Sequence, residues 1–190
     1  MEQLLDLDIF VKEVLEPLNL KSGTRRKQMF KKGHGYTEPK GSFSALYGYT
    51  NIGYLSPTKS RVKIGDRLFE TSLKTQRPDL HGKFQELVDK LCQEPFEVCM
   101  VQINCNWQSP RHKDGGNQDE SWIIGLGDYE GGELIIEYEE PEEFDIKNKF
   151  LKFNGAKHYH YTNPWKGNRY SLVFFKHKLF STNKVNDTSI

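Results

Sequence analysis

The chain has 190 residues and a mass of 22.2 kDa, enough for one full-sized core and short for two, so we expect a single domain over residues 1–190. A net charge of +1 excludes a chain-wide bias toward nucleic acid or membranes. The amino terminus is acidic where a secretory signal is basic, no apolar run approaches about 20 residues, and three cysteines show no CxxC spacing. We therefore expect a soluble, monomeric intracellular protein of the cytoplasm or nucleus, without a signal peptide or membrane partner.

Residues 1–95 are predicted to hold two helices and a basic loop region. The first helix ends before Pro17 and has the apolar residues Leu4, Leu7, Phe10, Val11, Val14 and Leu15 at helical spacing. Asp79 is predicted to cap the second, which ends before Pro95 and has the apolar face Leu80, Phe84, Leu87, Val88 and Leu91. Between them, residues 21–63 suggest loops around short strands.

Charge is segregated along the chain. The segment from Lys21 to Lys63 contains ten basic residues and one acid, Glu38. Residues 115–145 contain eleven acids and no base. Such a distribution can build a dipolar surface.

Residues 96–178 are predicted to form a core of short strands. Alternating or apolar segments occur at 96–107, 121–127, 132–138, 149–153 and 169–177. Gly131-Gly132 and Asn154-Gly155 lie between them as turn signals. Evenly spaced strands without intervening helices indicate a mainly β (α+β) jelly roll with the two helices packed outside. Residues 179–190 are expected to form a frayed tail.

The stretch RHKDGG, residues 111–116, places a histidine and an aspartate two positions apart. If the backbone is extended here, His112 and Asp114 share one face, because strand side chains alternate. Together with a second histidine they would form the 2-His-1-carboxylate triad that binds non-haem Fe(II) and leaves open positions. The pattern alone is also common in solvated turns, so a third ligand has to decide.

Candidates for that ligand lie downstream. His158 and His160 follow Asp114 by 44 and 46 residues. Arg169 begins the next predicted strand, and its guanidinium can bind a carboxylate in a bidentate way, although a surface salt bridge is the ordinary role of such a residue.

This combination of HxD, distal histidine and arginine resembles the 2-oxoglutarate and Fe(II) dependent dioxygenases over residues 98–178. In related sequences the distal histidine precedes a proline by four residues, as His160 precedes Pro164. The resemblance implies a double-stranded β-helix and the cofactors Fe(II), 2-oxoglutarate and O2. It also implies a metal site and a cosubstrate site made of His112, Asp114, His160, Arg169 and Ser171. Arg169 would bind the distal carboxylate of 2-oxoglutarate, Ser171 would add a second bond, and His158 would flank the site or lie on the surface.

The segments HKDGGN (112–117) and RYSLVFFKHK (169–178) resemble more narrowly the TET/JBP group, which oxidises the 5-methyl group of pyrimidines in nucleic acid. Carried over by position, the resemblance implies that Phe175 stacks on a flipped base, that His177 hydrogen-bonds it and that Asn117 contacts its polar edge. The chain lacks the cysteine-rich and inserted regions of the animal TET enzymes, so the match is to the minimal core of microbial, algal or viral members. Apart from the resemblance, an aromatic residue at a strand end usually belongs to the core.

The expected function is oxidation of 5-methylcytosine in DNA to 5-hydroxymethylcytosine, with thymine as second substrate. The basic segment, and within it Arg25, Arg26 and Lys27, is expected to contact phosphates, although it can also be a solvated loop. Two alternatives remain open. The first is an enzyme that hydroxylates a protein side chain, as prolyl hydroxylases do, or a small metabolite. The second is a cupin-like metal-binding module without activity.

Overall fold

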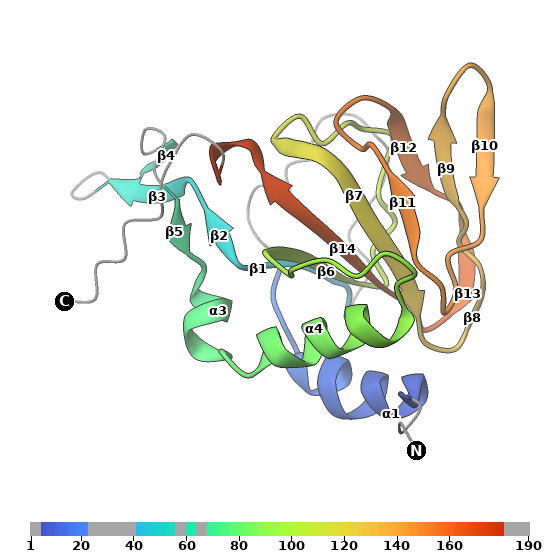
Figure 1. The fold of residues 1–190 in the computed structure, drawn as a ribbon, viewed down its shortest axis with the longest axis horizontal. Helices are drawn as coiled ribbons and strands as arrows, with labels where there is room; N and C mark the ends of the chain where they lie inside the picture. Colours follow the sequence, from blue (N-terminus) through green and yellow to red (C-terminus); the bar gives the residue numbers. More distant parts are fainter. Residues whose placement is uncertain (1–4, 23–40, 56–59, 64–67, 181–190) are drawn as a thin grey trace.

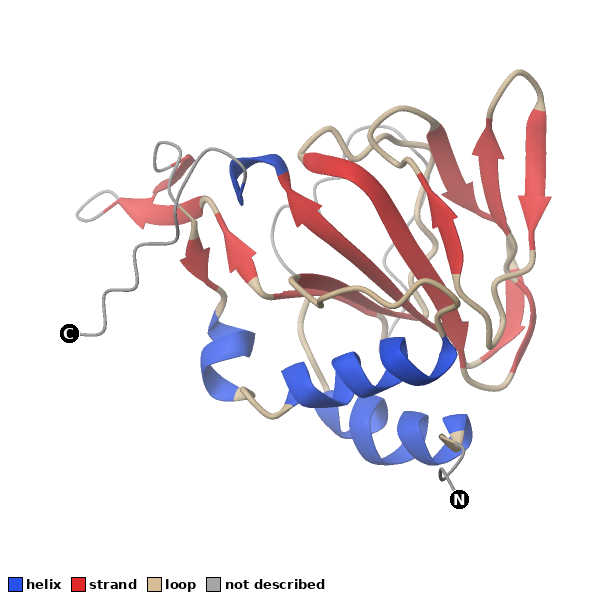
Figure 2. Ribbon diagram, viewed as in Figure 1, coloured by secondary structure: helices blue, strands red, loops and turns tan. Residues whose placement is uncertain are grey.

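The computed structural model describes residues 5–22, 41–55, 60–63 and 68–180, and within them the chain is mainly β, as predicted (Figures 1 and 2). The strands are β1 (Phe43–Tyr47), β2 (Tyr49–Thr50), β3 (Ile52–Leu55), β4 (Ser60–Lys63), β5 (Phe69–Glu70), β6 (Met100–Cys105), β7 (Asn117–Leu126), β8 (Tyr129–Gly131), β9 (Leu134–Glu137), β10 (Pro141–Phe144), β11 (Leu151–Phe153), β12 (Tyr159–Thr162), β13 (Trp165–Gly167) and β14 (Tyr170–His177).

The helical segments lie together on one side of the strands (Figure 2). They are α1 (Leu7–Phe10), the π-helical turn η1 (Val11–Leu15), the 3-10 turn η2 (Glu16–Leu18), α3 (Ser72–Gln76) and α4 (Leu80–Leu91). A last 3-10 turn, η3 (Lys178–Phe180), follows β14 and lies apart from this group (Figure 2). None of the helices in the described ranges is long and apolar enough to cross a membrane.

The first helix is present but differs from the prediction at its end. It continues through Pro17 as η2 instead of ending before it, and the preceding turn η1 is π-helical. In a regular α-helix the ring of Pro17 would clash with the carbonyl group four residues earlier. The wider turn lies where that clash would occur, so the chain stays helical to Leu18.

The second helix, α4, buries the predicted face and ends at Leu91, before Pro95. The predicted capping bond of Asp79 is wrong. Asp79 occupies the capping position, but its carboxylate makes no bond to the helix backbone and instead accepts two hydrogen bonds from Arg77, at 2.9 and 2.8 Å. The bidentate pair gives this carboxylate two hydrogen bonds from a cationic partner, where a cap would give it bonds from neutral amides, which explains the choice of partner.

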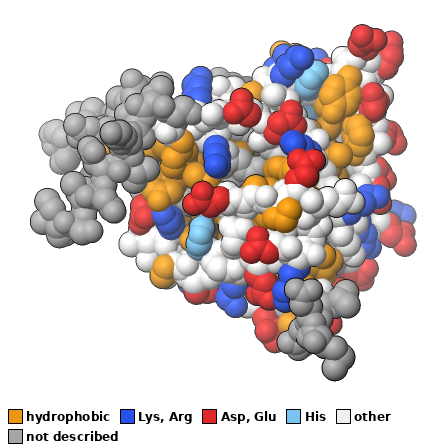
Figure 3. All heavy atoms as spheres, in the orientation of Figure 1, with side chains coloured by type: hydrophobic (Ala, Val, Ile, Leu, Met, Phe, Trp, Pro, Cys, Tyr) orange, Lys and Arg blue, Asp and Glu red, His pale blue; other side chains and the backbone are white. Residues whose placement is uncertain are grey.

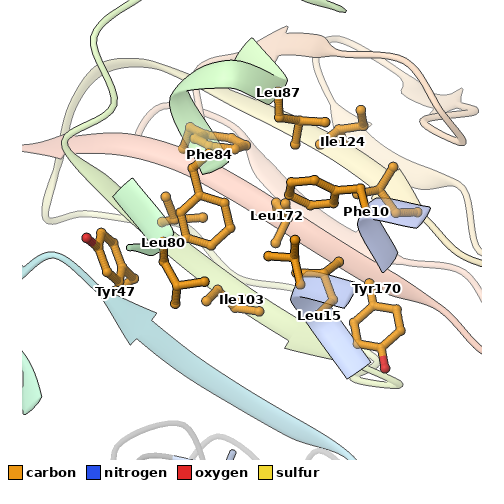
Figure 4. Close-up of a cluster of buried hydrophobic side chains, with 14 of the residues drawn as sticks. Phe10, Leu15, Tyr47, Leu80, Phe84, Leu87, Ile103, Ile124, Tyr170 and Leu172 are labelled. Atoms are coloured by element: carbon orange, nitrogen blue, oxygen red, sulfur yellow. The ribbon is translucent and has the colours of Figure 1, made fainter. Parts of the chain in front are cut away.

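The main sheet has the strand order β1-β6-β14-β7-β11 and is antiparallel throughout. Its two faces differ. Toward α4 and the amino-terminal helical turns, the sheet presents apolar side chains, and Figure 4 shows Ile103, Ile124 and Leu172 packed against Phe84 and Leu15. These five side chains are completely buried. The helix-facing side is therefore the principal hydrophobic core.

The second sheet, β10-β9-β12, faces the other side of the main sheet. The segment before β7 joins it through an isolated antiparallel bridge between His112 and His160. From β6 onward the chain crosses repeatedly between these two facing sheets, while β8 and β13 pair in a small sheet of their own, and this is the predicted jelly-roll or double-stranded β-helix arrangement. A smaller cluster that includes Ile123 from the main sheet and Leu134 and Ile136 from the second sheet packs between them.

The five predicted strand segments correspond to β6, β7, β9, β11 and β14, while β8, β10, β12 and β13 were not predicted. Short strands in residues 41–63 agree with the interpretation of that region as loops around short strands. The basic residues Arg25, Arg26 and Lys27 and the tail beyond residue 180 lie outside the described residues, so these predictions stay open.

Candidate active site

A cavity lies between the two sheets at the end where His112 and His160 pair. Its lining comes from both sheets and the connecting loops and consists of Gln102, Asn104, Ser109, His112, Asp114, Asn117, Ile123, Leu134, Phe153, His160, Thr162, Ser171, Val173 and Phe175. The main sheet presents four polar and four apolar residues to this cavity, whereas its helix-facing side is apolar.

Three potential metal ligands meet at the cavity. The Nε2 atom of His112 lies 3.6 Å from one carboxylate oxygen of Asp114, and Nε2 of His160 lies 3.5 Å from the other. The ligand atoms of all three residues lie within 4.8 Å of one another, close enough for a group that could hold one metal ion. His160 is buried, and the other two are half-buried, so the group opens toward the cavity mouth.

Backbone contacts set the orientation of both imidazole rings. The Nδ1 atom of His112 lies 2.7 Å from the carbonyl oxygen of Pro110, and Nδ1 of His160 lies 3.1 Å from that of His158. A carbonyl oxygen only accepts, so each Nδ1 carries the proton. The lone pair of each histidine is then on Nε2, the atom that faces Asp114, as is typical of metal-binding histidines.

The segment that carries His112 and Asp114 is extended, as the HxD interpretation requires. His112 and His160 exchange two backbone hydrogen bonds of 3.0 Å, and the Asp114 amide donates to the carbonyl of Gly155 at 2.8 Å. Both ligands therefore point to the cavity face.

The opposite face of this segment is fixed by charged and aromatic contacts. Arg111 makes a bidentate ion pair with Glu137, at 2.8 and 2.6 Å, and its guanidinium lies 3.6 Å from the centroid of the Tyr159 ring. The ammonium group of Lys113 lies 4.5 Å from the same centroid. Arg111, Glu137 and Tyr159, which we call the clamp, thus connect the ligand segment to β9 and β12.

Gly155 allows the ligands to approach closely. A Cβ atom at this position would lie 3.1 Å from Phe153, 3.2 Å from His160 and 3.3 Å from the carboxylate of Asp114. The predicted Asn154-Gly155 turn is present, with the Asn154 side chain accepting from the Lys157 amide at 2.9 Å. The sequence signalled a turn, but the role of this glycine is to leave room for the ligands.

Arg169 is buried immediately before β14 and is not among the residues that line the cavity. Only 2% of it is exposed, Nη2 donates to the carbonyl of Gly132 at 3.0 Å, and Nε has no hydrogen-bond partner. Among the described residues, no carboxylate forms an ion pair with it. Burial lowers the pKa of Arg169, and the nearby Tyr129 and Glu133 oppose this shift. A buried guanidinium without an anion is costly, which makes this a place where an anionic ligand would be stabilised.

Ser171, Asn117 and Phe175 all line the cavity. Ser171 follows Arg169 by two residues and shares its face. Asn117 donates to Ser121 Oγ at 3.1 Å. The pairing of β14 with β7 shifts register between Phe174 and Lys176, and such bulges redirect side chains beside functional sites. The structure therefore gathers these three predicted residues around one cavity.

His177 and His158 do not line the cavity. Nδ1 of His177 accepts from the amide of Leu179 at 3.1 Å, and its Nε2 faces Gly116. Nδ1 of His158 lies 3.3 Å from the carbonyl oxygen of Glu137, and its ring packs edge-on against Tyr138, 4.7 Å away. Of the two candidate distal histidines, the structure places His160 with the other ligands.

Several cavity residues were missed by the sequence interpretation, chiefly Gln102, Asn104 and Thr162. The signal was present in β6, where Gln102 and Asn104 alternate with the apolar residues Val101 and Ile103. All residues of β6 are buried, and buried polar side chains need hydrogen-bond partners. The polar face of β6 therefore indicated a polar environment on that side of the sheet.

No protein-family model matches the chain, and no curated protein matches its sequence. Among the solved structures that align with it is an oxidoreductase of the 2OG-Fe(II) oxygenase family from Burkholderia pseudomallei (18% identity, 80% of this chain and 75% of that chain, TM-score 0.44). Others are NgTET1 in complex with 5mC DNA (15%, 88% and 69%, TM-score 0.45) and the prolyl hydroxylase from Trichoplax adhaerens in complex with a hypoxia inducible factor peptide (11%, 94% and 80%, TM-score 0.49). Similarity this low carries no conclusion about activity, so the function has to be inferred from the residues of this chain.

Proposed function

We propose that the protein is an Fe(II) and 2-oxoglutarate dependent dioxygenase. The observation that carries this proposal is the convergence of His112, Asp114 and His160 on one cavity, with both histidines presenting Nε2. Two imidazole nitrogens and one carboxylate are the donor set of non-haem Fe(II) sites, which keep positions open for other ligands.

The residues beyond the metal ligands fit the cosubstrate. Arg169 is a buried cation without an ion-pair partner among the described residues, and Ser171 brings a hydroxyl group to the cavity from the same face. These two residues would hold the distal carboxylate of 2-oxoglutarate by charge-assisted hydrogen bonds. Bound iron, 2-oxoglutarate and O2 would supply the oxidising power, and the protein would orient the substrate and exclude water.

For the substrate, we propose the 5-methyl group of a pyrimidine in DNA, with 5-methylcytosine first and thymine second. An enzyme that oxidises this group has to extrude the base and hold it between an aromatic ring and polar groups. Phe175 and Asn117 are available at the cavity for stacking and for reading the polar edge. His177 would have to give up its contacts around Gly116 and Leu179 to join them.

The proposal is tested by incubating the protein with Fe(II), 2-oxoglutarate and DNA that contains 5-methylcytosine, followed by mass spectrometry of the nucleosides and measurement of succinate. We expect 5-hydroxymethylcytosine and an equal amount of succinate. Asp114→Ala serves as the inactive control, and unmethylated DNA of the same sequence reports thymine oxidation. Succinate without any modified nucleoside would retain the dioxygenase and reject the DNA substrate.

The base pocket is tested separately with Phe175→Ala. Stacking of a base on an aromatic residue is worth about 1–3 kcal/mol, so DNA oxidation should fall by about 5- to 150-fold while iron binding is retained. Oxidation of methylated DNA at the wild-type rate would reject this role of Phe175.

A contribution of the basic segment is measured as the salt dependence of DNA binding. Replacing Arg25, Arg26 and Lys27 together should flatten that dependence, because each phosphate contact releases counterions. An unchanged slope would show that these residues do not contact the backbone.

A protein side chain is the second candidate substrate, and one surface feature favours it. The hairpin β9–β10 extends from the metal end of the second sheet and carries the acidic residues Glu137, Glu139, Glu140, Glu142 and Glu143, and Figure 3 shows acidic side chains over this part of the molecule. Such a surface repels phosphates and attracts basic peptides. Hydroxylation of a basic peptide with no change in DNA would select this candidate. A cupin-like module without activity predicts no succinate at all.

A further inference from the structure

Three polar side chains form a row across the cavity face of the main sheet, and a fourth, Gln102, joins it from the next position on the same face of β6. Ser44 on β1 pairs in register with Asn104 on β6, which pairs with Ser171 on β14. Asn104 contacts Ser44 Oγ at 2.6 Å and Ser171 Oγ at 3.1 Å, and Nε2 of Gln102 contacts Ser44 Oγ at 3.0 Å. None of the four is more than 6% exposed, so each group depends on its neighbours for hydrogen bonds.

The two contact distances favour one orientation of the Asn104 amide. Hydrogen bonds between two oxygens are typically about 2.7–2.8 Å long, and those from nitrogen to oxygen about 2.9–3.0 Å. The contact of 2.6 Å to Ser44 therefore involves the amide oxygen, and the contact of 3.1 Å to Ser171 involves the amide nitrogen. The reversed amide would place a nitrogen at 2.6 Å, which is shorter than the usual range.

This orientation sets the direction of every bond in the row, because each hydroxyl group has one proton. Ser44 donates its proton to Asn104 Oδ1 and accepts from Gln102 Nε2. Asn104 donates to Ser171 Oγ, so the row does not use the proton of Ser171. Since Ser171 lines the cavity, that proton can be donated to a group inside it. With the reversed amide, the Ser171 hydroxyl would instead donate its hydrogen bond to the amide oxygen of Asn104.

We infer that Asn104, oriented by Ser44, is a positioning residue that makes Ser171 a hydrogen-bond donor into the cavity. This end of the cavity is then selective for a ligand with an accepting group, and the buried cation of Arg169 on the same face restricts the acceptor to an anion such as a carboxylate. The inference rests on the proposed function for the identity of that carboxylate, the distal one of 2-oxoglutarate.

A double-mutant cycle between Ser44 and Ser171 tests the inference, because neither change alters charge and Asn104 lies between the two residues. The measurement is calorimetric titration of 2-oxoglutarate into protein loaded with Zn(II), which does not turn over. Ser171→Ala should weaken binding by about tenfold through loss of a charge-assisted bond. Ser44→Ala should weaken it by about threefold to tenfold, because the Asn104 amide is then free to rotate.

The decisive result is the effect of Ser44→Ala in the Ser171→Ala background. If Ser44 acts through the donor proton of Ser171, its effect on affinity disappears there. Additive losses would show a merely structural role and overturn the inference. The same outcome follows if Ser44→Ala leaves wild-type affinity unchanged. The Tm of each variant confirms that it is folded.

Neutron diffraction from the deuterated wild-type protein provides a test that needs no variant and no ligand. The inference requires the deuteron of Ser44 to lie toward Asn104 Oδ1 and a deuteron on Asn104 Nδ2 to lie toward Ser171. The reversed amide would overturn it. A wild-type protein that fails to bind 2-oxoglutarate would instead reject the proposed function, and the deuteron positions would still decide the inference.

Discussion

The two faces of β14 differ in chemistry although they belong to the same eight residues. Tyr170, Leu172 and Phe174 pack into the helix-facing core, whereas Ser171, Val173 and Phe175 line the cavity. Strand alternation thus separates the residues that stabilise the fold from those that surround the site. Substitutions at neighbouring positions of β14 should therefore have different effects. On the helix-facing side they should lower stability, and on the cavity side they should weaken ligand binding.

The largest effect is expected from a metal ligand on the cavity face. Asp114→Ala should lower metal affinity by more than about 100-fold, because losing only the hydrogen-bond partners of metal ligands typically costs about 10- to 100-fold. The Tm should remain near the wild-type value. Metal titration followed by spectroscopy measures the affinity, and Asp128→Ala, which removes an exposed carboxylate, is the control. If Asp114→Ala binds the metal as tightly as the wild type does, Asp114 is not a metal ligand and the cavity face is not assigned to metal binding.

The helix-facing side should respond in the opposite way. Leu172 is completely buried, so Leu172→Ala should lower the free energy of unfolding by about 2–5 kcal/mol through lost burial and the cavity left behind. Metal affinity should be retained in the folded protein. Denaturant unfolding measures the first quantity and metal titration the second. Val173→Ala, on the other face and only half-buried, should destabilise less.

Arg169 is as buried as the core residues, but its proposed role is to bind the cosubstrate. Arg169→Ala should weaken 2-oxoglutarate binding by about one to two orders of magnitude through loss of a charge-assisted bidentate contact. Arg169→Lys keeps the charge but lacks the planar guanidinium group. Its affinity for 2-oxoglutarate should lie between those of the wild type and Arg169→Ala. Calorimetry with Zn(II)-loaded protein provides the affinities. Equal affinities in all three proteins would contradict this role.

The smallest effect is expected at the clamp on the outer face of the second sheet. Arg111→Ala removes an exposed ion pair and a cation–π contact, both of which are weak where solvent screens them, so metal affinity should fall by only about threefold to tenfold. Arg77→Ala, which breaks a similar ion pair with Asp79 away from the ligands, should leave the affinity unchanged. Equal effects of the two changes would show that the clamp does not position His112 and Asp114.

The jelly roll and the pair of ligands in HxD could be predicted because both depend on local alternation, whereas His160 was chosen over His158 through the family resemblance. His112 and Asp114 share a face in any extended backbone, and the position of Arg169 immediately before a strand places Ser171 on its face. The end of the first helix was harder to predict, because a π-helical turn accommodates Pro17 through tertiary packing that no local pattern records.

The remaining parts of the site depend on which strands become neighbours. Ser44 and Asn104 are 60 residues apart, and only the pairing of β1 with β6 brings them together. The close approach to Gly155 likewise arises from the fold and not from a left-handed backbone that would mark the residue. The register shift between Phe174 and Lys176 is a third feature that alternation in a single strand does not reveal.

The central claim is that the cavity face holds one iron ion and 2-oxoglutarate. The most direct measurement is diffraction at the iron absorption edge from crystals prepared with Fe(II) and 2-oxoglutarate without oxygen. We expect one anomalous peak bounded by His112 Nε2, the Asp114 carboxylate and His160 Nε2, with the distal carboxylate of 2-oxoglutarate at Arg169 and Ser171. An iron peak at another site, or one that includes His158 in place of His160, would contradict it.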